Sequence, residues 1–460
     1  MLQGLLIRLR PLGPWRFGPG DGAHDRVDTL YRSDRLYSAV TLAMRQLGYM
    51  EEWLDATARA ETPAIVLSSL FPFQADTLFA IPPASLWPPP PSLVTTPSPV
   101  FLTKVRWRAA RFVPLTVLES LLTGQNILAD QWAPDAESGC LLRRDRPSSS
   151  PFRIVQRSFA AVDRVTGRSE HAARMACVEF EAGAGLWTAV RFADETAEST
   201  WTARIQAAFR LLADSGFGAR RSSGWGQAAA PEFQSGAWPQ LLMPKLKLGR
   251  NGAGNGSARL YWLLSLYSPA ASDSVDWSGG FYEVAVRGGR VESPAASGAP
   301  KKQIRLIAEG SVLSANSDLI GAAVDVAADG FAHPVYRSGL VLAIPLPALE
   351  LKPEPLFEEP PVTEAFDNLE AGVRDEEPPA PTPEPVPEEP MEPIREPEVL
   401  PEEPQPEEPT EPIEPPMEPP VEPPPIEEPE SEIHPVTEPI PEAGDDPQPD
   451  APSEEGSFDI

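Results

Sequence analysis

The sequence predicts an α+β protein in which a folded body, residues 1–352, is followed by a disordered acidic Pro/Glu-rich C-terminal tail, residues 353–460. Three observations lead to this prediction. In the body, short apolar runs with the period of strands alternate with two stretches of helical period. A glycine-rich loop, DSGFGARRSSGWGQ at residues 214–227, follows the second helical stretch. The composition changes abruptly at Pro353, where the body ends.

The tail differs from the body in charge and in proline content. It holds 35 Asp and Glu residues against two arginines, a net charge of −33, and 32 of the 58 prolines. Its Glu-Glu-Pro and Glu-Pro-Pro units cannot bury enough apolar surface to offset the entropy of ordering, so we expect an extended, self-repelling segment. PxxP motifs also fit an acidic Pro-rich adaptor, but the basic flank that SH3-like grooves favour is absent. The body alone carries +4, which is compatible with a polyanionic partner.

Cysteine content and hydropathy indicate the cellular compartment and restrict the possible disulfide and metal sites. Cys140 and Cys177 are the only cysteines, which excludes a disulfide framework and a four-thiolate metal site. No window of 18 uninterrupted apolar residues occurs, and Arg8 and Arg10 interrupt the N-terminal apolar run. We therefore expect a cytoplasmic protein with no membrane partner, no metal and no cofactor.

The first part of the body is predicted to form a strand, a helix and a strand pair. Residues 2–9 have strand character and lead into a loop rich in glycine and proline. Ser33 or Asp34 can cap a helix that closes at Gly48. Residues 64–82 contain two short β-like runs. The apolar stripe of the helix consists of Leu36, Val40, Met44 and Leu47.

The second part completes a recognisable order of elements. Residues 174–193 alternate around a Gly-Ala-Gly turn and predict a hairpin, and a helix then leads to the glycine-rich loop. This order suits a βαββαβ ferredoxin-like (RRM-like) domain with a large basic insertion, and residues 258–350 can supply a second such domain. The predicted divisions are residues 1–240, 241–352 and 353–460. The stripe of the second helix consists of Trp201, Ile205, Ala208, Phe209 and Leu212.

The glycine-rich loop has the composition of an anion site. Its glycines allow positive φ, so that successive amides can face one concavity, and arginine forks beside hydroxyls suit a chain of phosphates. It fits neither a Walker loop nor a dinucleotide loop, because the lysine of the first and the third glycine of the second are missing. A plain turn between a helix and a strand remains the alternative. The candidate residues are Gly216, Gly218, Arg220, Arg221, Ser222, Ser223, Gly224 and Gly226.

A basic stretch between Lys104 and Arg174 adds a second candidate surface. Arginine outnumbers lysine there, and arginine binds phosphate bidentately and stacks on bases. A genome rich in G and C would produce the same bias without a function. The candidates from this stretch for RNA binding are Arg153, Arg157, Arg164 and Arg168.

With these motifs in order, the chain resembles the RAMP proteins of CRISPR interference complexes, and among them the fourth-subunit family of the Csm (type III-A) complex. The resemblance lies in SDRLYSAV, SSLFPF, TKVRW, AVDRVTG, GFGARRSSGWGQ, LSLYSP, AEGSV and VYRSGLVLAIPL, in this order across nearly all of the body. Ala219 stands where the family usually has a glycine, and the tail has no counterpart in the family.

The resemblance implies a non-catalytic, antiviral-defence subunit built of two ferredoxin-like domains. Such a subunit binds the 5′ handle of the guide RNA, anchors the large polymerase-like subunit and adjoins the backbone RAMP subunit. It also implies that the glycine-rich loop holds handle phosphates, that Ser33 of SDRLYSAV binds RNA, and that Arg164 and Arg168 of AVDRVTG lie near the guide.

Two tryptophans and one histidine could each have a function other than the one that the resemblance implies. Trp107 or Trp225 could stack splayed bases of a single strand, although core packing explains a tryptophan equally simply. Some RAMP relatives cut the guide precursor, and His24 lies where a general base of such an endoribonuclease could be. No acid-base pair can be assembled around His24 from motif spacing, which favours the non-catalytic function.

Overall fold

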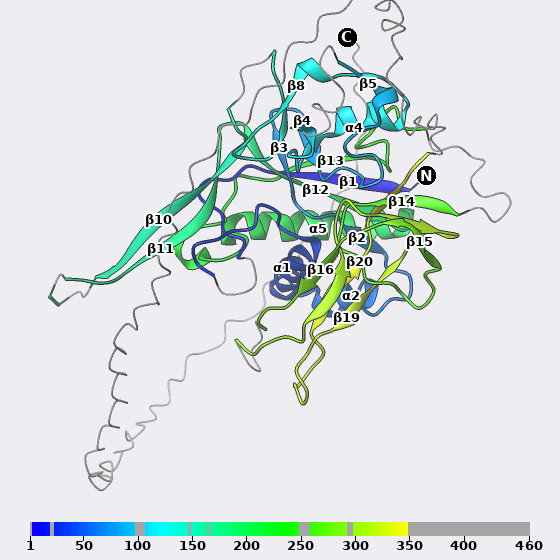
Figure 1. Ribbon diagram of the computed structural model, residues 1–460. Helices are drawn as coiled ribbons and strands as arrows, with labels where there is room; N and C mark the ends of the chain where they lie inside the picture. The colour runs from blue at the N-terminus through cyan, green and yellow to red at the C-terminus, as the bar shows by residue number, and fades with distance from the viewer. Residues whose placement is uncertain are drawn as a thin grey trace, which may run out of the picture. The chain divides into compact units, whose positions relative to one another are not determined.

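The computed structural model describes residues 2–18, 23–96, 106–145, 149–162, 165–166, 168–247, 258–291 and 298–347. All of these lie within one compact unit. The predicted tail, residues 353–460, lies outside the described residues. Helices and sheets occur together in this unit, so the predicted mixed α and β class is confirmed (Figure 1).

An antiparallel sheet forms the core of the N-terminal lobe (Figure 1). β1 (Gln3–Leu9) is the predicted first strand, and Leu5, Ile7 and Leu9 on it are completely buried. It pairs antiparallel with β12 (Ala184–Phe192) and with β13 (Glu232–Ala237). The sheet order is β13-β1-β12-β3-β4-β6, with β2 also paired to β12. The further strands are β2 (Ile65–Leu67), β3 (Phe71–Gln74), β4 (Thr77–Ala80) and β6 (Val113–Pro114).

Two long helices pack together beside this sheet, and both were predicted. α1 (Ser33–Gln46) buries Leu36, Val40 and Met44 of its predicted stripe, whereas Leu47 follows the helix and is half-buried. α5 (Glu195–Ser215) buries all five residues of its predicted stripe. The Asp194 carboxylate caps α5 by accepting a hydrogen bond from the Ala197 amide at 2.7 Å. The short helices α2 (Met50–Ala56) and α4 (Leu115–Leu122) were not predicted.

The predicted capping of α1 is wrong. Arg32 is the N-cap residue, and no side chain caps the helix. Ser33 and Asp34 are the first two residues of the helix, and their side chains instead make tertiary contacts with the C-terminal lobe. Because the start of α1 is buried between the two lobes, its polar side chains bind groups from distant strands in place of local amides.

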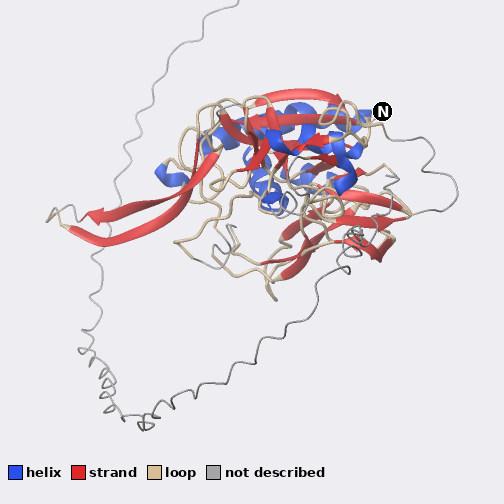
Figure 2. Cartoon of the chain, turned by 45° about the horizontal axis from the view of Figure 1, so that its top comes forward, coloured by secondary structure: helices blue, strands red, loops and turns tan. Residues whose placement is uncertain are grey.

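A long two-stranded arm projects from the body (Figures 1 and 2). It consists of β10 (Phe152–Val162) and β11 (Ser169–Phe180). The predicted hairpin over residues 174–193 is therefore wrong in its pairing, although both strands exist. β11 pairs with β10, whereas β12 enters the central sheet against β1, β2 and β3. Local alternation defines a strand but does not select its partner.

The C-terminal lobe contains a four-stranded antiparallel sheet in the order β15-β18-β14-β21. In the described part of this lobe no helix occurs. The hairpin β19–β20 lies in the chain between β18 and β21, and it packs on α1. The strands are β14 (Arg259–Leu263), β15 (Val275–Phe281), β16 (Val284–Arg287), β17 (Ile304–Ile307), β18 (Val312–Ala315), β19 (Gly321–Asp325), β20 (Tyr336–Leu340) and β21 (Ala343–Pro345).

Short elements complete the N-terminal lobe. β5 pairs with β7 and β8 with β9 at the side of the sheet that carries β4 and α4 (Figure 1). Their bounds are β5 (Val94–Thr95), β7 (Ile127–Leu128), β8 (Trp132–Pro134) and β9 (Leu141–Arg143), with 3-10 turns η1 (Pro91–Leu93), η2 (Ala129–Gln131) and η3 (Arg221–Ser223).

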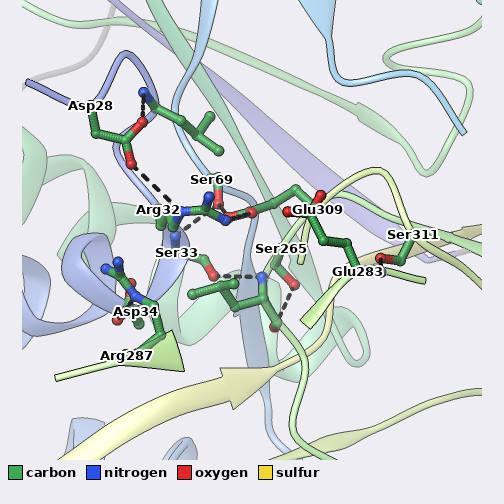
Figure 3. A network of polar contacts seen from close by, with 12 residues as sticks. Asp28, Arg32, Ser33, Asp34, Ser69, Ser265, Glu283, Arg287, Glu309 and Ser311 are labelled. Carbon is green, nitrogen blue, oxygen red and sulfur yellow. Dashed lines mark hydrogen bonds and ion pairs between the residues drawn. The ribbon is translucent and has the colours of Figure 1, made fainter. Parts of the chain in front are cut away.

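A buried polar network at the start of α1 joins the two lobes (Figure 3). The Asp34 carboxylate accepts hydrogen bonds from Arg287 at 3.0 and 2.9 Å and is also paired with Arg337. Its side chain is completely buried. Burial alone would raise the pKa of Asp34, but the two paired arginines hold this pKa below its ordinary value. Nearby, the Ser33 hydroxyl accepts a hydrogen bond from the Leu266 amide at 2.9 Å.

We predict that Asp34→Ala strongly destabilises the protein, because it leaves two buried guanidinium groups without their carboxylate. Loss of one partner from a buried ion pair costs about 3–5 kcal/mol in the free energy of unfolding. Urea denaturation measures this change. The control is Asp55→Ala, which removes an exposed partner of Arg59 and should cost less than about 1 kcal/mol. Equal losses in the two variants would contradict the importance of the buried pair.

Candidate nucleic-acid interface

The glycine-rich loop begins where α5 ends and lies against the N-terminal segment. All four predicted glycines have positive φ, from 76° to 90°. A Cβ atom on Gly218 would lie 2.4 Å from the Arg16 carbonyl oxygen, and one on Gly226 would lie 2.0 Å from the Phe217 carbonyl oxygen. These glycines are therefore needed for close backbone packing within the protein, whether or not a phosphate approaches them.

Most amides of the loop already donate to protein carbonyls. The Ala219 amide donates to Arg16 at 3.1 Å, and the Gly226 amide donates to Pro14 at 3.0 Å. Anion binding at the loop therefore depends on side chains more than on a cradle of amides. The remaining amides with carbonyl partners are those of Gly216, Phe217, Ser223, Gly224 and Trp225.

The two loop arginines have different surroundings. Arg220 adopts the left-handed conformation, with φ 66°, and its guanidinium carbon lies 4.2 Å from the centroid of the Phe159 ring on the arm. It thereby links the loop to the arm by a cation–π contact. Arg221, together with Ser222 and Ser223, is exposed. Arg221 is therefore the loop cation with access to a ligand.

Neither candidate tryptophan is exposed. Trp225 is 6% exposed and contacts the Phe159 ring at a centroid distance of 5.5 Å. Trp107 is 2% exposed and stacks on Trp87. Both rings serve core packing in this structure, which favours the structural alternative over base stacking.

Three of the four arginines predicted from the basic stretch lie on the arm within the described residues. Arg153 and Arg157 of β10 are exposed, and both pair with the single carboxylate of Glu179 on β11. One net positive charge therefore remains on this group. Arg168 is exposed near the tip of the arm, whereas Arg164 lies outside the described residues.

Ser33 lies apart from the loop and the arm, in the joint between the lobes. It is 2% exposed. Its amide donates to the Ser69 hydroxyl at 2.8 Å, and its own hydroxyl binds the Leu266 amide (Figure 3). The structure therefore gives Ser33 a role in joining the lobes, and its contact with RNA stays a prediction.

A cleft of about 1050 Å³ lies where α1, the glycine-rich loop and the C-terminal lobe meet. Among the predicted residues, Gly216, Gly218, Arg221 and His24 line it. Its other cations come from segments far apart in the sequence, so no run of basic residues indicated it. Eight basic side chains line the cleft (Arg16, Arg35, Arg45, Arg59, Arg221, Arg290, Lys301 and Arg337) against two acidic ones (Asp34 and Glu51).

Fold and cleft together define a two-lobed α+β protein with a basic cleft at the junction of its lobes. Residues 257–346, which span the strands of the C-terminal lobe, match the family model of the CRISPR Csm4 C-terminal domain. Csm4 is the fourth Csm subunit, so this match confirms the resemblance in the C-terminal lobe. A comparison with curated proteins gave no match.

Solved structures with Csm4 in their descriptions are similar to the chain. A chain of the crystal structure of the Csm3–Csm4 subcomplex in the type III-A CRISPR-Cas interference complex is 16% identical, with a TM-score of 0.49, over 75% of this chain and 99% of that chain. A chain of the Csm1–Csm4 cassette in complex with cA4 is 18% identical, with a TM-score of 0.43, over 76% and 99%. At these values neither similarity establishes a function.

Membrane-spanning helices and clusters of metal ligands do not occur within the described residues. No helix in these ranges is long and apolar enough to cross a membrane. Nor do the described parts of the chain bring together three or more His, Cys, Asp or Glu side chains that could hold a metal ion.

We predict that Gly226→Ala destabilises the protein more than Gly183→Ala. Both glycines have positive φ, 82° and 79°, so alanine should cost about 1–2 kcal/mol of conformational strain at either position. Only Gly226 adds a clash, with the Phe217 carbonyl, because the space around Gly183 is open. Thermal denaturation of both variants measures the difference, and equal melting temperatures would contradict the close packing of the loop.

Proposed function

We propose that this chain is the RNA-binding subunit of a type III-A CRISPR interference complex, without catalytic activity of its own. It binds the 5′ handle of the guide RNA and anchors the large polymerase-like subunit beside the backbone RAMP subunit, in the cytoplasm. The observation that carries this proposal is the basic cleft that the exposed Arg221 shares with a lobe matching the Csm4 C-terminal domain. The descriptions of the similar structures, which pair Csm4 with Csm1 and with Csm3, support the partners.

The proposed domain structure is that of two ferredoxin-like domains, residues 1–240 and 241–352, followed by a disordered tail over residues 353–460. The strand order β13-β1-β12-β3, with α1 after β1 and α5 after β12, is the order expected for a βαββαβ unit. The order β21-β14-β18-β15 repeats it in the C-terminal lobe. These orders support the same arrangement of strands in both lobes, with the hairpin β19–β20 in the second lobe at the place in the chain where the first has α5.

The ligand that fits the cleft best is a single-stranded polyanion. Several cations that line one cleft can contact successive phosphates of a nucleic acid strand, and such contacts position the strand without reading its bases. The exposed arginines of the arm extend this basic surface away from the body. We propose that Arg220 contributes indirectly, by holding the arm through its contact with Phe159. The full set of residues proposed to bind RNA is Gly216, Gly218, Arg220, Arg221, Ser222, Ser223, Gly224, Gly226, Arg153, Arg157, Arg164, Arg168 and Ser33.

The alternative, an endoribonuclease that uses His24 as its base, has one observation in its favour, because His24 lines the cleft. The hydrogen bonds of His24 to the described residues nevertheless involve its backbone carbonyl. Its carbonyl accepts hydrogen bonds from Arg16 at 3.2 Å and from the Ala176 amide at 2.8 Å. Among the described residues, no hydrogen bond joins its ring to an acidic or basic partner. A general base without an orienting partner makes the catalytic alternative weaker.

We predict that Arg221→Ala weakens binding of single-stranded RNA for every sequence tested. Loss of one phosphate contact should reduce the slope of log affinity against log salt by about 0.7. Fluorescence anisotropy at several salt concentrations measures both quantities. The control is Arg210→Ala, an exposed residue of α5 that does not line the cleft, which removes the same charge. An unchanged slope for Arg221→Ala would rule out direct phosphate contact.

We predict that His24→Ala leaves the length distribution of bound guide RNA unchanged, because catalysis does not belong to this chain. Sequencing the RNA that copurifies with the variant and its complex partners tests this. Accumulation of uncut precursor, with RNA binding retained, would instead support the endoribonuclease.

A further inference from the structure

Hydrogen bonds hold the base of the two-stranded arm to the body. Trp15 and Val178 exchange two backbone hydrogen bonds, at 2.9 and 2.8 Å. On β10, the Gln156 side chain donates to the Asp25 carbonyl at 2.8 Å. Both contacts lie in the half of the arm that joins the body (Figure 2). They fix the base of the arm and leave the direction of its outer half to other contacts.

Phe159 makes a contact with the body that lies further out along β10. Its ring centroid lies 4.2 Å from the guanidinium carbon of Arg220 and 5.5 Å from the ring centroid of Trp225, and both partners belong to the glycine-rich loop. Directly beyond this ring, the pairing of β10 with β11 shifts register between Phe159 and Ala161. A bulge of this kind bends a two-stranded ribbon. The bend therefore begins where the ring is held, so the position of the ring determines the direction of the outer arm.

The backbone fixes the loop side of this contact. The Ala219 amide donates to the Arg16 carbonyl at 3.1 Å, and the Trp225 amide donates to the Arg220 carbonyl at 3.3 Å. Arg220 has a φ of 66°, which a residue other than glycine keeps only where its surroundings impose it. Its neighbour Arg221 is exposed and lines the cleft. The residue that holds the arm and the residue that faces a ligand are therefore adjacent in one constrained turn.

We propose that Phe159 and Arg220 are positioning residues that fix the outer arm at one angle to the cleft, so that a single RNA strand can contact both. This inference rests on the proposed function, in which the cleft and the arm bind RNA, and it adds the contact that sets their geometry. A strand held at both places needs the arm in that orientation. Without the contact, the arm adopts this orientation for only a fraction of the time, and the apparent affinity falls by that fraction. A strand too short to leave the cleft is unaffected.

The test uses Phe159→Leu in the full-length protein, because leucine keeps an apolar side chain against Trp225 and removes the ring from the guanidinium group. The probes are two fluorescein-labelled oligouridylates, of about 5 and about 15 nucleotides, followed by fluorescence anisotropy. We expect the affinity for the longer strand to fall about fivefold, the effect of losing one cation–π contact. The affinity for the shorter strand should not change. Phe159→Tyr keeps an aromatic face and should restore the affinity for the longer strand.

Arg220→Gln tests the other side of the contact, and it also serves if Phe159→Leu does not fold. If Arg220 acts through Phe159, the two single variants and the double variant lose the same affinity for the longer strand. If Arg220 binds a phosphate directly, its loss adds to that of Phe159→Leu and extends to the shorter strand. That second result overturns the positioning role.

The direction of the arm can be measured without RNA, by double electron–electron resonance between two spin labels. The labels are placed at Val165→Cys, between β10 and β11, and at Thr200→Cys on α5, because both positions are exposed. The natural cysteines, Cys140 and Cys177, are buried and should not react with the label. We expect a narrow distance distribution with Phe159 or Phe159→Tyr and a broader one with Phe159→Leu. Equal widths in all three proteins overturn the proposal.

The remaining outcomes separate this proposal from the proposed function. If the wild-type protein binds neither strand, the proposed function fails, and the positioning of RNA fails with it. If the wild type binds the longer strand no more tightly than the shorter one, or if Phe159→Leu binds both strands as the wild type does, the positioning role is wrong and the proposed function stands. Equal losses with both strands, together with a lower melting temperature, show a general loss of folding and also overturn the positioning role.

Discussion

The buried pairing of Asp34 with Arg287 and Arg337 is the interaction on which the rest of the structure depends. It joins the first turn of α1 to two strands of the C-terminal lobe, β16 and β20. A buried carboxylate is stable only when its hydrogen bonds are satisfied, so the two lobes must meet in one arrangement for both arginines to reach it. The adjacent contact between Ser33 and Leu266 adds a neutral hydrogen bond to the same joint. Asp34 and Arg337 of this joint also line the cleft.

The same joint explains how a chain with a mildly basic body concentrates charge at one place. α1 contributes Arg35 and Arg45, the loop after α5 contributes Arg221, and the C-terminal lobe contributes Arg290 and Lys301. None of these segments is strongly basic by itself. Their approach in space produces a positive cleft whose field can attract a polyanion although the net charge of the body is only +4.

Within the glycine-rich loop, some residues pack against the protein while a neighbouring residue is exposed to a ligand. Gly218 and Gly226 allow the loop to approach the N-terminal segment, and Arg220 packs on the arm through Phe159. This packing leaves Arg221 exposed at the cleft. The local sequence predicts both arginines as equivalent phosphate ligands, because it contains no information about the Phe159 ring that Arg220 contacts.

The sequence by itself determined β1, the apolar stripes of α1 and α5, the positive φ of the four glycines and the resemblance carried by ordered motifs. These features depend on local periodicity, on the freedom of glycine and on residue order, all of which are written along the chain. Only the tertiary structure decided that β11 pairs with β10, and that Ser33 and Asp34 bind the other lobe. Each of these depends on groups far apart in the sequence, and their meeting follows from burial and hydrogen-bond satisfaction across the whole body.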